Sequence, residues 1–252
     1  MTEEELLQCV DEMVEVWGDI LVPIYTDKEF RDGVAFLLGT GFLAEYREEI
    51  FLVTAQHVIK DHSDKLLVIG IGDTSVPLSK MPFFASKEND LAVSRLEKEW
   101  ADEAGVGKVK AIPLEDKKEG YISEGRYFLM GFPGKKNTLN KRIGKDTKNI
   151  HGTSFVSKIE SPQSKTHIDC PVAFEFDKNS AINTDGQKTN PPSFSGNSGG
   201  PILQLMGKDI NRDHKTIGCR LSGIFTGWHQ NEKEAIAARP EALLELICRS
   251  VT

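Results

Sequence analysis

The sequence predicts an all-β protein with one amphipathic helix at its start and one helix at its end. Between residues 34 and 96, short apolar runs alternate with turn signals, and no intervening segment has a helical pattern. Short strands at this spacing are typical of an antiparallel barrel or sandwich. The two ends of the chain instead repeat their apolar residues every three or four positions, the period of a helix.

Residues 2–17 form the first predicted helix. Thr2 and Glu5 have the spacing of a capping box. The apolar stripe comprises Leu6, Leu7, Val10, Met13, Val14 and Trp17. The favoured interpretation is that this stripe packs on the body of the protein, and the alternative is a docking helix for a partner or a second copy of the chain.

The strands are predicted from apolar runs between turns. Residues 34–44 and 50–54 read as a hairpin, and further strands are expected at 66–71, 91–93, 121–130 and within 216–228. Residues 135–148 carry six basic side chains and one acid, so we expect a mobile, solvated loop there. Pro240 suits the first turn of a closing helix through Leu243, Leu244 and Ile247.

Composition narrows the class of protein. The 252 residues are 39% hydrophobic and 27% charged, which is ordinary for a globular protein. The net charge of −7 disfavours broad nucleic-acid binding, and no run approaches the ~18 apolar residues that span a bilayer. The histidines lack paired ligand spacing, so we expect neither a metal nor another cofactor.

Cysteine usage and the first residues predict a cytoplasmic protein. The chain opens with the acidic segment Met1-Thr2-Glu3-Glu4-Glu5, where a secretory signal would be basic and then apolar. Four cysteines lie far apart and form no CxxC pair. We therefore expect four free thiols in a reducing compartment.

One glycine-rich segment, Ser195-Gly196-Asn197-Ser198-Gly199-Gly200-Pro201, stands just before an apolar run. Its glycines permit a tight turn around Ser198, because glycine accepts positive φ and lets backbone approach backbone closely. The amides of Gly196 and Ser198 could then point together at a developing oxyanion. Taken alone, the segment also fits an ordinary loop between strands.

Two further segments supply the partners that a serine nucleophile needs. His57 lies near the end of the β-rich run 51–58, and Asp90 stands directly before the apolar run 91–93. A serine hydroxyl becomes a nucleophile beside a general base, and an acid fixes the tautomer of that base. Each residue has an alternative as a surface histidine or a turn acid, and Asp61, Asp64 and Asp73 are competing acids.

Four segments together resemble the chymotrypsin-fold (trypsin-like) serine peptidases, most closely the bacterial HtrA/Deg-type branch. They are Gly39-Thr40-Gly41-Phe42, Thr54-Ala55-Gln56-His57, Asn89-Asp90-Leu91-Ala92 and Gly196-Asn197-Ser198-Gly199-Gly200-Pro201. The resemblance implies two antiparallel six-stranded β-barrels. The expected units are 1–30 for the N-terminal helix and lead-in, 31–110 for the first barrel, and 111–252 for the second barrel with the C-terminal helix.

The resemblance also implies roles for single residues. Ser198 is the expected nucleophile, His57 its general base and Asp90 the acid that orients the base, with Gly196 and Ser198 as the oxyanion hole. Thr226 aligns with the residue that supports the catalytic acid, and Thr226, Gly227 and Trp228 should offer a strand edge to substrate.

The specificity pocket implied by the resemblance has no acid at its base. The residue expected there is Pro192, so selectivity for arginine or lysine is not supported. We expect a small or apolar side chain before the cut, with Phe225 lining that region.

Two departures from zymogen-activated trypsins bear on control. Asn197 stands where they place an aspartate, and no Ile-Val-Gly-Gly segment occurs near the start. Activation by N-terminal clipping is therefore not expected, and no PDZ-like domain is recognisable. The expected function is a serine endopeptidase acting on a protein or peptide substrate, in a bacterial stress or defence system. The alternative is a silent or partner-activated binding module on the same scaffold.

Overall fold

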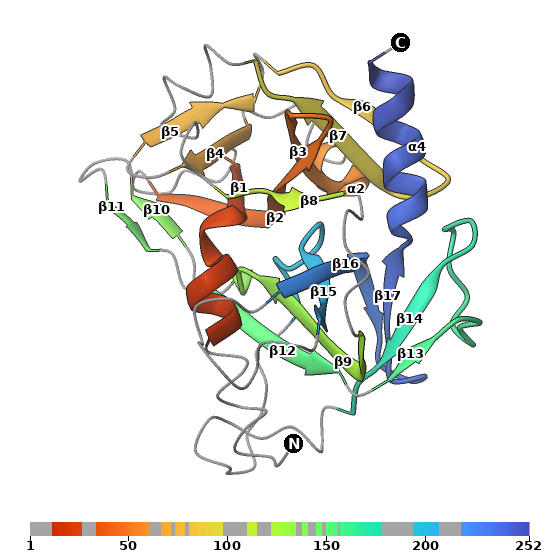
Figure 1. The fold of residues 1–252 in the computed structure, drawn as a ribbon. Coiled ribbons are helices and arrows are strands. Elements are labelled where there is room, and N and C mark those ends of the chain that lie inside the picture. The colour runs from red at the N-terminus through yellow and green to blue at the C-terminus, as the bar shows by residue number, and fades with distance from the viewer. Residues whose placement is uncertain are drawn as a thin grey trace.

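Two β-sheets stacked on one another build the protein in the computed structural model (Figure 1). The structure describes residues 12–26, 34–60, 67–71, 74–78, 81–97, 110–114, 122–134, 138–140, 145–147, 150–155, 157–177, 194–206 and 218–251.

The first sheet, sheet A, contains ten strands among the described residues. Its central path runs β5-β4-β1-β2-β3-β7-β6, with β8 and the β10–β11 pair attached to β2. All of its pairs are antiparallel except β2–β8. Its strands are β1 Leu21–Thr26, β2 Val34–Tyr46, β3 Glu49–Ala55, β4 Leu67–Ile71, β5 Thr74–Pro77, β6 Phe84–Ser86, β7 Leu91–Arg95, β8 Ile112–Pro113, β10 Thr138–Asn140 and β11 Lys145–Thr147.

The second sheet, sheet B, contains seven antiparallel strands in the order β12-β9-β15-β16-β17-β14-β13. Its strands are β9 Ile122–Gly131, β12 His151–Phe155, β13 Lys158–Ile159, β14 Val172–Glu175, β15 Pro201–Met206, β16 Gly218–His229 and β17 Glu234–Ala238. Two mainly antiparallel sheets confirm the predicted all-β class. Ten and seven strands replace the expected six and six, and no pairing among the described residues closes either sheet.

The predicted hairpin is confirmed. β2 pairs with β3 from Gly41 opposite Thr54 to Tyr46 opposite Glu49. The turn residues between them, Arg47 and Glu48, both have positive φ, 50° and 65°. A tight reversal of this kind explains why a charged segment joins two apolar strands.

The predicted solvated loop at 135–148 is wrong for residues 138–140 and 145–147, which form strands; its other residues lie outside the described part. β10 pairs with β11, and β10 also pairs with β2, with Thr138 opposite Phe36. A basic, polar sequence fits an edge hairpin because only one of its sides needs a partner. β8, β10 and β11 come after position 110 and thus add strands to sheet A. The expected boundary between a first barrel at 31–110 and a second barrel at 111–252 stays a prediction.

Helices flank the sheets at both ends of the chain. Residues 12–17 are helical and continue into the 3-10 turn η1 Gly18–Ile20; residues 1–11 lie outside the described part. Met13 and Trp17 are buried in the core, as the favoured interpretation of the apolar stripe requires. No helix in the described part of the chain combines the length and apolar character needed to cross a membrane.

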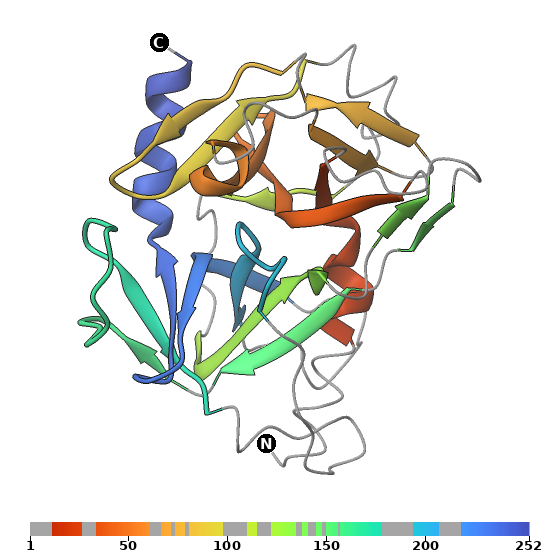
Figure 2. The same ribbon diagram turned by 180° about the vertical axis from the view of Figure 1, so that it is seen from behind.

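The closing helix, α4 Pro240–Ser250, begins with proline at its first turn, as predicted. It buries Leu243, Leu246 and Ile247. Seen from behind, α4 continues from β17 of sheet B and rises alongside sheet A (Figure 2). The helix therefore spans both layers.

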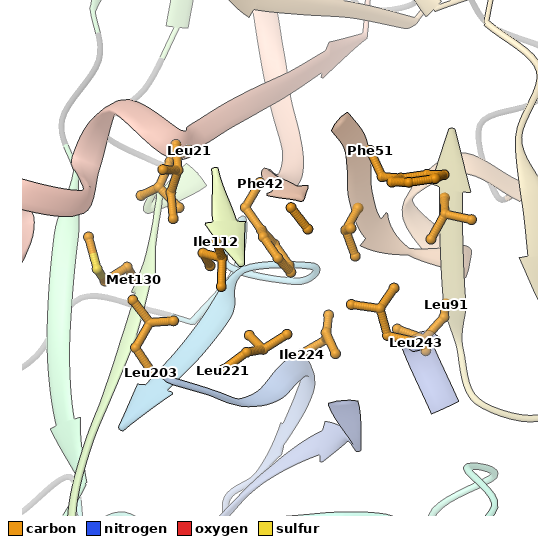
Figure 3. Packing of buried hydrophobic residues seen from close by; sticks show 14 of the residues in the cluster. Leu21, Phe42, Phe51, Leu91, Ile112, Met130, Leu203, Leu221, Ile224 and Leu243 are labelled. Atoms are coloured by element: carbon orange, nitrogen blue, oxygen red, sulfur yellow. The ribbon is translucent and has the colours of Figure 1, made fainter. Parts of the chain in front are cut away.

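A shared apolar core joins the two sheets (Figure 3). Phe42, Phe51 and Leu91 come from sheet A, and Leu203, Leu221 and Ile224 come from sheet B. Burial of such side chains contributes about 1.5–3 kcal/mol each. The core packs β2 and β3 against β15 and β16, and these strands carry or adjoin His57, Thr40, Ser198 and Thr226.

Candidate active site

His57 and Asp90 form a direct pair. His57 lies in the short helix α2 Gln56–Lys60, which follows β3, and its Nδ1 is 2.7 Å from Asp90 Oδ2. The other carboxylate oxygen, Oδ1, accepts the backbone N–H of His57 at 2.9 Å. The Asp90 side chain is 2% exposed and the His57 side chain 37%. A buried carboxylate thus fixes an imidazole whose other edge reaches the surface.

The backbone of Asp90 is held in an uncommon conformation. Its φ is 50°, in the left-handed region, where aspartate is tolerated better than most residues. Its carbonyl oxygen accepts the N–H of Gln56 at 3.0 Å, and β7 begins at the next residue. β3 and β7 are neighbours in sheet A, so their ends bring His57 and Asp90 together.

Ser198 lies in a tight turn before β15, as its glycines predict. Gly196 and Gly199 have φ of 90° and 87°, which side-chain-bearing residues rarely adopt. The N–H of Asn197 bonds to Phe194 O at 3.0 Å, and that of Gly200 to Asn197 O at 2.8 Å. Ser198 itself is half-buried.

Thr40 in β2 holds this turn from the opposite sheet. Its hydroxyl donates to Gly196 O at 2.7 Å and accepts the N–H of Phe132 at 3.1 Å. Its own N–H donates to Ser198 O at 2.8 Å, and its carbonyl accepts the Thr54 hydroxyl at 2.8 Å. Thr40 is fully buried, so these bonds are shielded from water.

The turn also packs against the chain on both sides of His57. A methyl group on Gly199 would come within 2.7 Å of the backbone nitrogen of Ala55, two residues before His57. A methyl group on Gly39 would lie 3.0 Å from Ser198 O and 2.7 Å from a methyl of Val58, the residue after His57. The Ser198 turn and the His57 segment are therefore neighbours, with glycine required at their contact.

Two amides of the turn are open. Ser195 O accepts the N–H of Gly134 at 2.8 Å, and the peptide bonds are all trans. The Gly196 N–H consequently points away from Gly134, because C=O and N–H of a trans peptide point in opposite directions. Within the described chain, no group accepts a hydrogen bond from the amide of Gly196 or Ser198.

The three residues predicted to bind substrate lie on β16, just past the end of its pairing with β15. That pairing ends with Pro201 opposite Ile224, whereas β17 continues to pair with β16 as far as His229. A methyl group on Gly227 would meet nothing within 4 Å. Thr226 to Trp228 thus lack a described strand partner on one side.

Thr226 does not support Asp90 as expected. Its hydroxyl donates to the carbonyl oxygen of Ile236 at 3.1 Å, across a bulge between β16 and β17. A hydroxyl has one proton to donate, so this bond takes it. In this structure the recorded partner of the Asp90 carboxylate is His57, through both ring and backbone.

Asn197 fills the space beneath the turn. It is 2% exposed, and its Oδ1 has no hydrogen-bond partner among the described residues. A methyl group on Gly131 would lie 2.7 Å from this oxygen, so a glycine in β9 makes room for it. Among the described residues no cation is paired with Asn197, and the neutral amide suits this place because a buried ionised carboxylate would need such a partner.

A loop from sheet B is fastened beside the Asp90 turn. Asp169 N donates to Glu88 O at 2.7 Å. The loop is anchored by Glu234, whose 3%-exposed carboxylate accepts N–H bonds from Gln163 and Ser164 and the Ser164 hydroxyl. Burial raises the pKa of this carboxyl, but the bonds from Ser164 and Gln163 outweigh it and leave the pKa below the ordinary value.

Pro192 and Cys9 lie outside the described residues. The other cysteines, Cys170, Cys219 and Cys248, are free thiols. In the part of the chain that the structure describes, no three His, Cys, Asp or Glu side chains gather as metal ligands would.

The comparisons with known proteins agree with this geometry. A family model, described as a trypsin-like peptidase domain, matches residues 39–210, which include His57, Asp90 and Ser198. This chain belongs to the trypsin-like peptidase family.

Solved structures share the fold of this trypsin-like domain at low sequence identity. The serine endoprotease from Yersinia pestis is similar with a TM-score of 0.54 and 16% identity, over 95% of this chain and 65% of that one. The HtrA-type protease AlgW with a tripeptide gives a TM-score of 0.52 and 16% identity, over 94% and 61%. This chain thus spans less than two thirds of either structure's length. No curated protein matches it.

The sequence motifs of this trypsin-like domain did not point to Thr40 as the link between the sheets. The glycines around Thr40 allow a close approach of backbone, and the structure has such an approach between Gly39 and Ser198. What the pattern could not predict is the partner, because Gly196 and Phe132 lie far away along the chain.

Proposed function

We propose that this chain is a serine endopeptidase, which hydrolyses peptide bonds of a protein substrate through an acyl-enzyme on Ser198. The observation that carries the proposal is the buried Asp90 carboxylate, bonded to both Nδ1 and the backbone N–H of His57. That pair stands beside a glycine-rich turn whose serine is half-buried.

In this proposal His57 is the general base. Because Asp90 Oδ2 lies 2.7 Å from Nδ1, the ring proton sits on Nδ1 and Nε2 is left unprotonated. Nε2 takes the proton of the Ser198 hydroxyl while its oxygen attacks the substrate carbonyl carbon. His57 then gives that proton to the leaving amine, and a water molecule hydrolyses the acyl-enzyme in the same way.

The amides of Gly196 and Ser198 would stabilise the oxyanion. Both are open among the described residues, and the bond between Ser195 O and Gly134 N keeps that carbonyl out of their way. One such donor is worth about 10²–10³ in kcat. Substrate would lie as an added strand along Thr226 to Trp228, where β16 pairs with β17 on one side and has no described partner on the side of β15.

A fluorophosphonate probe tests the proposal, since it reacts with an activated serine. We expect one label on the wild type, none on Ser198→Ala, and a loss of peptide turnover of about 10⁶ in Ser198→Ala and in His57→Ala. Thermal unfolding of each variant confirms that its fold is kept. Peptide binding by a folded wild type that never labels would favour the alternative, a binding module on a peptidase scaffold.

A further inference from the structure

Four aromatic side chains gather beside the Ser198 turn. Phe176 follows β14, Phe194 opens the turn, and Phe225 and Trp228 belong to β16. The Phe194 ring lies at the centre of this aromatic cluster, with ring centroids 5.1 Å from Phe176, 5.5 Å from Phe225 and 5.3 Å from Trp228. The Phe194 contacts with Phe176 and Trp228 are edge-to-face, a preferred geometry of aromatic pairs, whereas the Phe194 and Phe225 rings are tilted at 41°.

Backbone hydrogen bonds tie the aromatic cluster to the nucleophile. Phe194 O accepts the N–H of Asn197 at 3.0 Å. Phe225 exchanges two bonds with the glycines that follow Ser198: Gly199 N donates to Phe225 O at 2.7 Å, and Phe225 N donates to Gly200 O at 2.9 Å. The rings therefore keep a fixed position relative to Ser198.

The aromatic cluster fills the space that small residues across the sheet leave. Phe225 lies opposite Ala237 and Trp228 opposite Ala235 on β17. Phe176, Phe194 and Phe225 are only 9%, 8% and 1% exposed. Trp228 is partly exposed, so its ring closes the cluster on the solvent side.

Packing, and not hydrogen bonding, sets the place of the Trp228 ring. Its Nε1–H is buried and has no acceptor among the described residues. A buried donor without a partner is unfavourable, so the position is held by ring contacts with Phe194 and Phe176. The volume of the ring is then the property that matters at this position.

A substrate strand along the open edge of β16 would end at Ser198. Its last residue before the cut is the one nearest to Ser198, and the side chain of that residue would meet the aromatic cluster. We propose that Trp228, backed by Phe194, occupies the volume a large side chain would need there, and so restricts cleavage to positions after glycine, alanine or serine. This inference rests on the proposed peptidase function.

A peptide series that varies only the residue before the cut tests this inference. The wild type should cleave after alanine with a kcat/KM at least about tenfold higher than after leucine or phenylalanine, because excess volume in a filled site is rejected. Trp228→Ala should raise the leucine and phenylalanine values relative to alanine by about tenfold or more. Trp228→Phe keeps most of the ring and should keep the preference for small residues.

Controls separate this inference from the proposed function. Phe84→Ala removes a 47%-exposed ring from the edge strand β6 and should leave the preference unchanged. Fluorophosphonate labelling of each variant reports the nucleophile, and thermal unfolding reports the fold. A wild type that is labelled but prefers leucine or phenylalanine would overturn the inference while the peptidase function stands.

Binding provides a readout that does not need turnover. In a Ser198→Ala background, fluorescein-labelled peptides with alanine at the varied position should bind at least about tenfold more tightly than those with phenylalanine. Adding Trp228→Ala should narrow that ratio. Equal affinities in the Ser198→Ala background, or an unchanged ratio after the tryptophan is removed, would rule out Trp228 as the determinant of specificity.

Discussion

At the scale of single residues, the Asp90 carboxylate has two acceptor roles that only two oxygens can fill. Oδ1 accepts the His57 backbone N–H and Oδ2 faces the ring nitrogen Nδ1. A side chain with one oxygen and one nitrogen can serve only one of these roles. The backbone bond decides which, because a peptide N–H can only donate.

Asp90→Asn should therefore reverse the tautomer of His57. The asparagine oxygen would accept the backbone N–H, so its NH₂ group would face Nδ1 and the ring proton would move to Nε2. We expect kcat to fall about 10³–10⁴-fold while KM and the folded structure change little. Steady-state kinetics with a peptide substrate measures the loss.

Asp90→Ala is the companion variant, because it removes both acceptors at the same position. The His57 N–H then loses its partner, so the free energy of unfolding should fall as well as kcat. Should Asp90→Asn keep the kcat of the wild type, Asp90 would not orient the base and the proposed mechanism would fail.

At the scale of elements, one threonine of β2 positions a turn that belongs to β15. All three polar atoms of Thr40 are bonded, in four hydrogen bonds: its hydroxyl to Gly196 O and Phe132 N, its N–H to Ser198 O and its carbonyl to the Thr54 hydroxyl. The contact lies between the two sheets. Placement of the nucleophile thus depends on sheet A as much as on its own strand.

Thr40→Val keeps the shape of the side chain but leaves Gly196 O and Phe132 N without partners. Each buried unpaired group costs about 1–3 kcal/mol, so we expect the free energy of unfolding to fall by about 2–6 kcal/mol. Urea denaturation followed by fluorescence measures this change. Fluorophosphonate labelling should slow at least about tenfold, because the Gly196 amide shifts with its carbonyl.

Thr40→Ser is the matched control, since it keeps the hydroxyl and removes only a methyl group. It should cost about 1 kcal/mol and leave the labelling rate near that of the wild type. If serine and valine slowed labelling equally, the hydroxyl would not position the turn.

Local sequence patterns predicted the elements better than the contacts between them. Apolar runs separated by a turn predicted the hairpin of β2 and β3, and Pro240 predicted the start of the closing helix α4. The glycines around Ser198, which accept positive φ, predicted the tight turn. The pairing of β10 with β2 was not predicted, because a short polar strand has no apolar face to reveal it.

The same limit applies within the candidate site. His57, Asp90 and Ser198 sit in recognisable motifs, and the structure joins the first two directly. The aromatic cluster and the bond from Thr226 to Ile236 depend on how distant strands align. Register of this kind is set by the packed sheets and not by any single segment.

At the scale of the whole molecule, α4 packs against strands of both sheets. The helix leaves β17 of sheet B, and its buried face lies among residues of both layers, with Leu243 near Leu91 and Ile224 (Figure 3). Loss of the Leu243 side chain would open a cavity where the layers meet. Both sheets should then lose stability together.

Leu243→Ala should lower the free energy of unfolding by about 2–5 kcal/mol, the usual cost of a buried leucine in a core that relaxes only in part. For a chain of this size that is a fall in Tm of about 4–20 °C. Differential scanning calorimetry should record one transition in both the wild type and Leu243→Ala.

Leu244→Ala, the same deletion at the adjacent, half-buried position, is the matched control and should cost about 1 kcal/mol of stability. Two separated transitions in Leu243→Ala would mean that the sheets unfold independently and that the shared core does not couple them.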